Sequence, residues 1–185
     1  VLPAGGAAFT VNALEGNDTI VVGSWAVVVD GGAGTGTVSY RSATAGVTVN
    51  LHNREAFGPS LTGAQQLVGI ESVEGSAFAD TLVGNDLANR IDGLGGSDRL
   101  YGEGSSLCTT GSTDVLLGSD GNDELHGYVG NDTLDGGLGA DRLNGQGGTD
   151  TATYLTRTTP LAVSLDGVTN DGAAGEGDNV AADIE

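Results

Sequence analysis

The sequence predicts an all-β fold in which short parallel strands stack as coils, and three observations lead to this prediction. From residue 75 to residue 153, a glycine, an aspartate and an aliphatic residue recur every nine positions, apart from one insert. So short a period implies stacked identical units rather than an ordinary globular core. The composition agrees, with 34 glycines among 185 residues and only three Phe and one Trp. The aliphatic residues also keep a fixed phase, which an acidic disordered linker would not require.

Eight nonapeptide units make up the periodic region. One unit is divided by the seven-residue insert SSLCTTG at 105–111, which contains the single cysteine, Cys108. We expect Cys108 to be a tolerated loop residue, because one cysteine gives no disulfide framework. The units are GSAFADTLV (75–83), GNDLANRID (84–92), GLGGSDRLY (93–101), the divided unit (102–104 with 112–117), GSDGNDELH (118–126), GYVGNDTLD (127–135), GGLGADRLN (136–144) and GQGGTDTAT (145–153).

Each unit divides into a turn and a short strand. The first six positions are rich in Gly, Asn and Asp, which tolerate tight turns, and the last three read as a strand. Side chains alternate along a strand, so the middle position points inward while its neighbours, such as Arg90, Arg99, Glu124, His126 and Arg142, face water. Two units make one coil with two strands. The predicted inward residues are Leu82, Ile91, Leu100, Leu116, Leu125, Leu134, Leu143 and Ala152.

Stacked coils would bring the acidic turn residues together in two rows. One edge would carry Asp80, Asp98, Asp123 and Asp141, and the other Asn89, Asp114, Asp132 and Asp150. Carboxylates one strand spacing apart repel each other strongly without a counterion. The chain has net charge -19 and no lysine, and its arginines are expected to be exposed. Oxygen-rich, flexible turns favour Ca²⁺ over Mg²⁺, and the absence of a Cys and His cluster disfavours zinc.

Other motifs are excluded by their own requirements. A phosphate-binding P-loop needs a lysine, and collagen needs glycine at every third position. An EF-hand starting at Asp120 would need glycine and glutamate where Leu125 and Asn131 stand. The repeat accounts for nearly all paired carboxylates, so we expect no enzymatic activity in this segment.

The stretches GSDGNDELH, GYVGNDTLD and GGLGADRLN resemble the G-G-x-G-x-D-x-U-x nonapeptide of the RTX (repeats-in-toxin, haemolysin-type) calcium-binding proteins. The resemblance implies a right-handed parallel β-roll, a calcium-binding β-solenoid, with flanking β-rich linker or capping segments. It also implies that each ion lies between two turns on one edge, held by two position-six aspartates and by turn carbonyls.

Carried over to this chain, the resemblance implies about four to six Ca²⁺ ions. The first row would bind them between Asp80 and Asp98, Asp98 and Asp123, and Asp123 and Asp141. In the second row the pairs expected to bind calcium are Asp114 with Asp132 and Asp132 with Asp150. The site between Asn89 and Asp114 is expected to be weakened by the asparagine and by the insert. The implied turn ligands are Gly93, Gly95, Gly118, Asp120, Gly127, Gly130, Gly136 and Gly139.

Four segments are expected along the chain. Residues 1–39 would be the degenerate end of a preceding roll, in which only Asp18 survives as an acidic ligand and calcium binds weakly or not at all. Trp25 is expected to be a packing residue there. Residues 40–74 and 154–185 would be β-rich linkers or caps on either side of the roll at 75–153. Residues 35–71 match 149–185 at an offset of 114, and within them VTVNL and LAVSL read as half-buried strands.

The predicted function is that of a structural calcium-binding module in a larger secreted bacterial protein. Extracellular calcium modules bind at about 10⁻⁴ to 10⁻³ M, and metal binding would contribute its free energy to folding. The resemblance implies export of an unfolded chain by a one-step (type I) route. We expect neighbouring domains of the same chain as partners, no nucleic acid and no membrane insertion. The alternative is a recognition module that binds a carbohydrate or a cell surface, and a weaker one is an ice or mineral binder through Thr81, Thr133 and Thr151.

Overall fold

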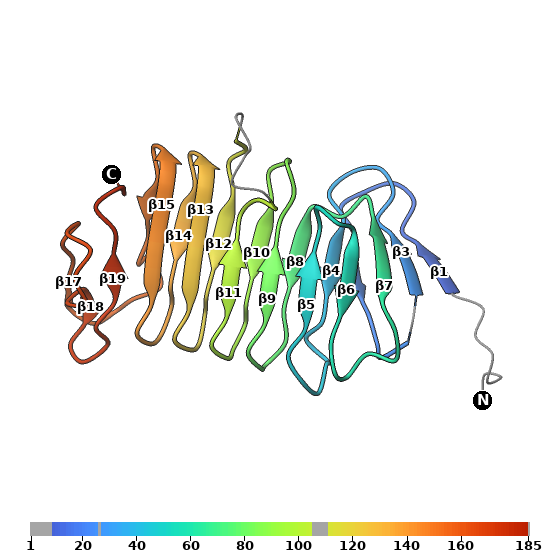
Figure 1. Ribbon diagram of the computed structural model, residues 1–185, viewed down its shortest axis with the longest axis horizontal. Coiled ribbons are helices and arrows are strands. Elements are labelled where there is room, and N and C mark those ends of the chain that lie inside the picture. The colour runs from blue at the N-terminus through green and yellow to red at the C-terminus, as the bar shows by residue number, and fades with distance from the viewer. Residues whose placement is uncertain (1–8, 26, 105–110, 185) are drawn as a thin grey trace.

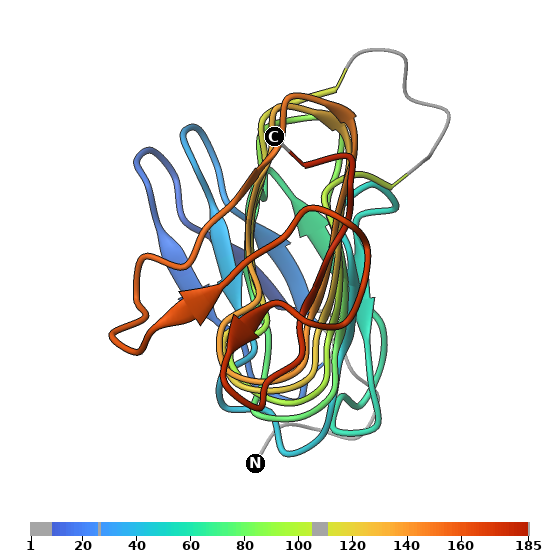
Figure 2. The same ribbon diagram turned by 90° about the vertical axis from the view of Figure 1, so that its left-hand side faces the viewer.

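The computed structural model describes residues 9–25, 27–104 and 111–184. All regular elements within these residues are strands, and most of them belong to two parallel-stranded sheets that face each other along one stack (Figure 1). Seen along the stack, the central coils superpose as one flattened ring (Figure 2). Cys108, in the insert, lies outside the described residues. None of the described elements is a helix long and apolar enough to cross a membrane.

The larger sheet has ten described strands. In spatial order they are β1 (Phe9–Asn12), β3 (Val27–Asp30), β7 (Gln65–Val68), β6 (Glu55–Phe57), β5 (Thr48–Asn50), β9 (Thr81–Val83), β11 (Arg99–Tyr101), β13 (Glu124–Gly130), β15 (Arg142–Gly148) and β19 (Asn179–Val180). Its pairs are parallel except on either side of β6, which is antiparallel to both β5 and β7. The segment 40–74 therefore contributes strands to the sheet itself.

The smaller parallel sheet has seven described strands. They follow the order β16 (Thr151–Ala152), β14 (Thr133–Asp135), β12 (Val115–Leu117), β10 (Arg90–Asp92), β8 (Ser72–Glu74), β4 (Thr37–Ser39) and β2 (Thr19–Val21). A separate antiparallel pair, β17 (Leu161–Ala162) and β18 (Gly172–Ala173), lies at the C-terminal end. Consecutive nonapeptides alternate between the two main sheets, so one coil is two units, as the sequence predicts.

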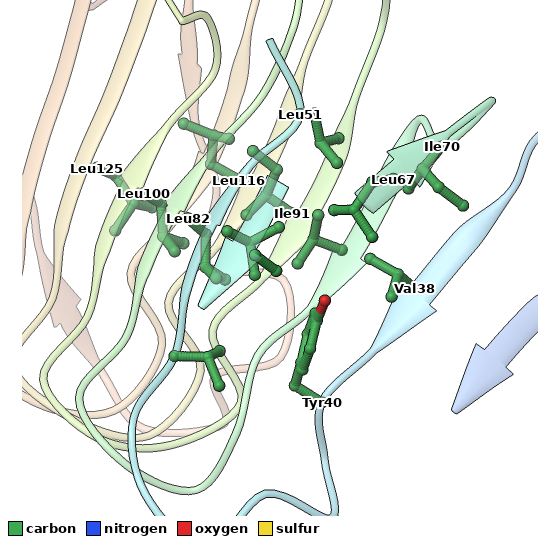
Figure 3. Packing of buried hydrophobic residues seen from close by; sticks show 14 of the residues in the cluster. Val38, Tyr40, Leu51, Leu67, Ile70, Leu82, Ile91, Leu100, Leu116 and Leu125 are labelled. Carbon is green, nitrogen blue, oxygen red and sulfur yellow. The ribbon is translucent and has the colours of Figure 1, made fainter. Parts of the chain in front are cut away.

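The core is a double row of aliphatic side chains between the sheets. Leu82, Leu100, Leu125 and Leu143 pair in register along one sheet, and Ile91, Leu116, Leu134 and Ala152 along the other. The leucines and the isoleucine are at most 1% exposed, and Ala152 packs against them. Figure 3 shows how the labelled members of these rows meet Val38, Tyr40, Leu51, Leu67 and Ile70 of the N-terminal half. The predicted inward positions are therefore confirmed.

The two sequence repeats at 35–71 and 149–185 differ in their packing. In the first copy Val49 and Leu51 are buried, because β5 pairs with β9 of the roll. In the second copy β17 is two residues long, and Val163 and Leu165 are 47% and 45% exposed. The prediction of a half-buried strand is confirmed for VTVNL and wrong for LAVSL, whose counterpart of β9 is absent from the described residues.

Two further expectations for single side chains are wrong. Trp25 was expected to pack, but it is 59% exposed and lines an open apolar groove with Phe9, Val11 and Ile20. The arginines were all expected to be exposed. Arg90, Arg99 and Arg142 are, whereas the Arg157 side chain is only 6% exposed and forms an ion pair with Glu176.

Candidate metal centre

The position-six side chains form two rows, in which one carboxylate oxygen of every residue after the first links neighbouring coils. On the first edge, the Oδ1 atoms of Asp98, Asp123 and Asp141 accept hydrogen bonds from the backbone N–H of the position-six residue one coil earlier, at 2.8, 2.8 and 2.9 Å. On the second edge, Asp114, Asp132 and Asp150 do the same at 2.8, 2.8 and 2.9 Å. The structure thus brings together the seven predicted aspartates in the two predicted rows.

The second oxygen of most of these aspartates lacks a hydrogen-bond donor. The side chains of Asp98, Asp114, Asp123, Asp132 and Asp141 are at most 2% exposed, and their Oδ2 atoms have no hydrogen-bond partner among the described residues. A buried carboxylate is stable only when it is paired or coordinates a metal. These oxygens therefore suit a cation between the coils.

The first glycine of each unit lies directly against this oxygen. A Cβ atom added at Gly93 would lie 2.3 Å from Asp98 Oδ2 and 3.0 Å from the Gly118 carbonyl oxygen of the next coil. One added at Gly118 would lie 2.4 Å from both Asp123 Oδ2 and the Gly136 oxygen. On the second edge, a Cβ at Gly127 would lie 2.5 Å from Asp132 Oδ2 and 2.9 Å from the Gly145 oxygen. Only glycine fits between a carboxylate oxygen and a carbonyl oxygen that face the same small space.

The remaining predicted turn residues lie where the backbones of successive turns stack closely on each other. Gly95 and Asp120 form a parallel bridge, and the Asp120 side chain is exposed. Added Cβ atoms at Gly130 and Gly139 would lie 1.9 Å from the Ser112 oxygen and 1.7 Å from the Gly121 oxygen of the preceding coil. No cluster of three or more Asp, Glu, His or Cys side chains positioned for a metal occurs in the described ranges. An ion between two coils would therefore need backbone carbonyls to complete a shell of oxygen ligands, the type that Ca²⁺ takes.

Burial changes the acidity of the row. Loss of hydration raises the pKa of six carboxyl groups, because the charged form is disfavoured away from water: those of Asp80, Asp98, Asp114, Asp123, Asp132 and Asp141. The pKa rises to about 8 for Asp98, about 7 for Asp114 and Asp141, and about 6 for Asp123 and Asp132. Carboxylates of neighbouring coils add to this effect, since the charges of Asp123 and Asp80 raise the pKa of Asp98. A bound divalent cation would favour the deprotonated forms.

The first residue of each row differs from the residues that follow it. Asp80 Oδ1 accepts hydrogen bonds from Val47 N and Ser76 Oγ, and its Oδ2 accepts one from Ser76 N, so both oxygens are engaged. Asn89 occupies the expected place in the second row, but its Nδ2 donates to the Glu71 carbonyl at 2.9 Å.

Two buried acidic residues near the rows were missed at the sequence level. Asp178 extends the first row, since its Oδ1 accepts the Asp141 N–H at 3.0 Å. Glu103 is 2% exposed and raises the pKa of Asp114 and Asp132. Neither stands at position six of a nonapeptide, so the period carried no signal for them.

Comparison with known proteins agrees with this geometry. The family model described as RTX calcium-binding nonapeptide repeat (4 copies) matches residues 69–106, 109–143 and 117–152, which together span less than half of the chain. None of the curated proteins compared with the chain matches it. The matched region contains the central coils, the two aspartate rows and the position-one glycines that lie beside the aspartate oxygens. The segment from residue 69 to residue 152 is therefore a calcium-binding β-roll of RTX nonapeptide repeats.

Proposed function

We propose that the roll binds Ca²⁺ between successive coils and that the chain completes its folding when these ions bind outside the cell. The observation that supports this most directly is the buried row of Oδ2 atoms without hydrogen-bond donors. Each ion would be held by two aspartates and by carbonyls of the position-one glycines. This ligand set gives three sites on the first edge, from Asp80 to Asp141, and two on the second, from Asp114 to Asp150.

Charge explains why the ions would control folding. The chain carries a net charge of -19, and its buried carboxylates repel one another across the coils. Each ion adds two positive charges at the place where the repulsion is greatest, so its binding free energy becomes folding free energy. Modules of this kind bind at about 10⁻⁴ to 10⁻³ M, a range typical of the extracellular medium. Secretion in a larger bacterial protein accords with such an affinity. We propose no catalytic role.

A calcium titration followed by circular dichroism tests this function. The metal-free chain should give a coil-like spectrum that becomes β-type as calcium is added, and Mg²⁺ at equal concentration should be far less effective. A β-type spectrum in metal-free buffer that calcium leaves unchanged would contradict calcium-dependent folding.

A matched pair of variants localises the effect. Asp123→Asn removes a buried row carboxylate, and Glu124→Gln removes the same charge from the adjacent side chain, which faces solvent at 37% exposure. We expect Asp123→Asn to raise the calcium concentration at the folding midpoint about tenfold, since it removes a ligand shared by two ions. Glu124→Gln should leave the midpoint within about twofold. Equal shifts in the two variants would argue for a general charge effect instead.

A second candidate function is recognition of a carbohydrate. It is favoured by one observation, the convergence of Tyr101, His126 and Tyr128, whose ring centroids lie 5.3 to 6.2 Å apart with planes inclined by 12° to 28°. Gln146 Nε2 lies 3.3 Å from His126 Nδ1 at the edge of this cluster. Aromatic faces beside polar groups are suited to a sugar ring. A glycan array with the calcium-loaded chain tests this candidate, and a real signal should be lost in Tyr128→Ala without a change in bound calcium.

A further inference from the structure

The C-terminal hairpin exposes an apolar strand whose counterpart in the first half of the chain is buried. Residues 161–165 (LAVSL) stand at the offset of 114 from residues 47–51 (VTVNL). Leu161, Val163 and Leu165 are between 38% and 47% exposed, whereas their three counterparts are at most 4% exposed. β17 pairs with β18 along one edge, and its other edge has no partner strand among the described residues. An unpaired edge with apolar side chains is a template for another strand.

In the first half of the chain, a nonapeptide strand covers the equivalent position. β9 runs parallel to β5, with Val49 opposite Leu82. The Thr81 N–H donates to the Val47 carbonyl at 2.9 Å, and the Val47 N–H donates to Asp80 Oδ1 at 2.7 Å. The covering segment therefore supplies an aspartate followed by a three-residue strand with an aliphatic residue at its centre. A partner for the exposed hairpin strand needs the same order of groups.

The N-terminal end of the stack offers such a segment. β2 (Thr19–Val21) directly follows Asp18 and has Ile20 at its centre. It is the last strand of the smaller sheet and pairs only with β4 among the described residues. Asp18 Oδ2 is buried and has no hydrogen-bond partner among these residues. Val21 is 44% exposed and lines the open apolar groove that contains Trp25.

The two apolar surfaces lie at opposite ends of one molecule. The hairpin of β17 and β18 is at one end of the stack, and β1, which lines the same groove as β2, is at the other (Figure 1). The surfaces are therefore too far apart to meet within one chain, but they can meet between two chains arranged head to tail. Terminal repeats of a solenoid usually present a polar outer face, and neither end of this stack does.

We propose that residues 161–165 of one chain pair in parallel with β2 of a second copy. Ile20 would lie opposite Val163, and the Asp18 carboxylate would accept the Leu161 N–H, as Leu82 and Asp80 do within the chain. The contact joins two different surfaces, so it adds chains in one direction. Each chain carries a net charge of -19, and salt should strengthen the association by screening this repulsion. The contact needs the folded chain and does not depend on which ions the roll binds.

The average mass of the full-length chain in saturating calcium, measured by sedimentation equilibrium from about 1 µM to about 1 mM, tests the proposal. The mass should rise above that of one chain as the concentration increases. Val163→Asp and Val21→Asp each place a charge in one of the two surfaces, and each should weaken association at least about tenfold. Leu87→Asp is the matched control, since it adds the same charge at a leucine that is 56% exposed in a turn of the roll, and it should leave association unchanged.

A mixture of the two surface variants tests the head-to-tail arrangement. Val163→Asp keeps the β2 surface and Val21→Asp keeps the hairpin surface, so an equimolar mixture should form one-to-one dimers and nothing larger. Each variant alone should stay monomeric at concentrations where the parent chain associates. A mixture that stays monomeric would overturn the proposal. So would a parent chain that is monomeric at the highest concentration, or equal weakening by Leu87→Asp.

Hydrogen exchange of the unmodified chain decides the question even when a variant does not fold. The backbone amides of residues 161–165 and 19–21 should both exchange more slowly at the highest concentration than at the lowest, because pairing protects them. Association without slower exchange in both segments would place the contact elsewhere and overturn the proposal.

Discussion

At the scale of single residues, the recurring geometry of the turns sets different requirements at their first two positions. The position-one glycine is needed for space, because an added Cβ would collide with the aspartate of its own unit. In other units the second position has a left-handed backbone, which Leu94, Ser119, Tyr128 and Gln146 adopt with φ between 69° and 75°. Substitutions at the two positions should therefore have opposite effects.

Gly118→Ala is expected to destabilise the roll by about 1–3 kcal/mol, because its Cβ would lie 2.4 Å from both Asp123 Oδ2 and the Gly136 oxygen. It should also weaken calcium binding. Gly147→Ala is the control, since its nearest contact would be 3.4 Å away and its φ is not positive. Urea unfolding in saturating calcium measures the stability of both variants, and equal losses of stability would refute the steric explanation.

Gln146→Gly is expected to stabilise the calcium-loaded chain by about 0.5–1 kcal/mol. Gln146 is exposed and has φ 69°, a conformation that costs an ordinary residue about 1–2 kcal/mol. Part of the gain is offset by the greater freedom of glycine in the unfolded chain. Gln146→Ala removes the same side chain but keeps the strained backbone, so thermal unfolding should show no gain for it.

At the scale of the strands, stability depends on the inward leucine of each three-residue strand. Leu125 lies between Leu100 and Leu143 in the register of the large sheet and is fully buried. The sheets are held together at few other buried side chains per coil, so each of these contacts matters more than in a wide core.

Leu125→Ala should cost about 2–5 kcal/mol, the range for removing a buried leucine from a packed interior. Leu138→Ala changes the same side chain where it is 55% exposed in a turn, and should cost less than about 1 kcal/mol. Denaturant unfolding of both variants at saturating calcium provides the comparison. Similar losses would mean that the leucine row does not form the core.

The same strands show how far sequence alone could predict the structure. The nine-residue period predicted the strands, the inward positions and both aspartate rows, because each depends on local spacing and on the stacking of identical units. The period carried no information about β6, whose antiparallel pairing with β5 and β7 arises in the segment 40–74, which lacks the nine-residue period. Asp178 was also beyond reach, since the C-terminal segment brings it to the row by tertiary folding at irregular spacing.

At the scale of the whole molecule, the buried carboxyl groups link folding to protons and, under the proposed function, to calcium. Burial raises the pKa of five row aspartates, Asp98, Asp114, Asp123, Asp132 and Asp141, to between about 6 and about 8, while unfolded aspartates titrate near about 4. The metal-free folded chain thus holds protons more tightly than the unfolded chain does. This contribution to stability is fully present below about pH 4 and is lost as the pH rises to about 8.

The metal-free chain should therefore gain folded structure on acidification from about pH 8 to about pH 4. With calcium the dependence of stability on pH should reverse over the same range, so that stability falls on acidification. The ion binds the deprotonated carboxylates, and protons compete with it. Thermal unfolding at a series of pH values, with metal removed by resin rather than by a pH-sensitive chelator, measures both slopes. If stability changed with pH in the same direction with and without calcium, the proposed competition between protons and calcium would be contradicted.

The alternation of consecutive nonapeptides between two sheets restricts how a gene for such a roll can lengthen or shorten. Loss of nine residues would move every downstream strand to the opposite sheet and exchange the two aspartate edges, whereas loss of eighteen would remove one full coil and keep all later strand partners. The divided unit around the insert shows the other permitted change, since extra residues within a turn leave β12 in register with β10 and β14. Duplication and deletion in rolls of this construction should therefore proceed by pairs of repeats.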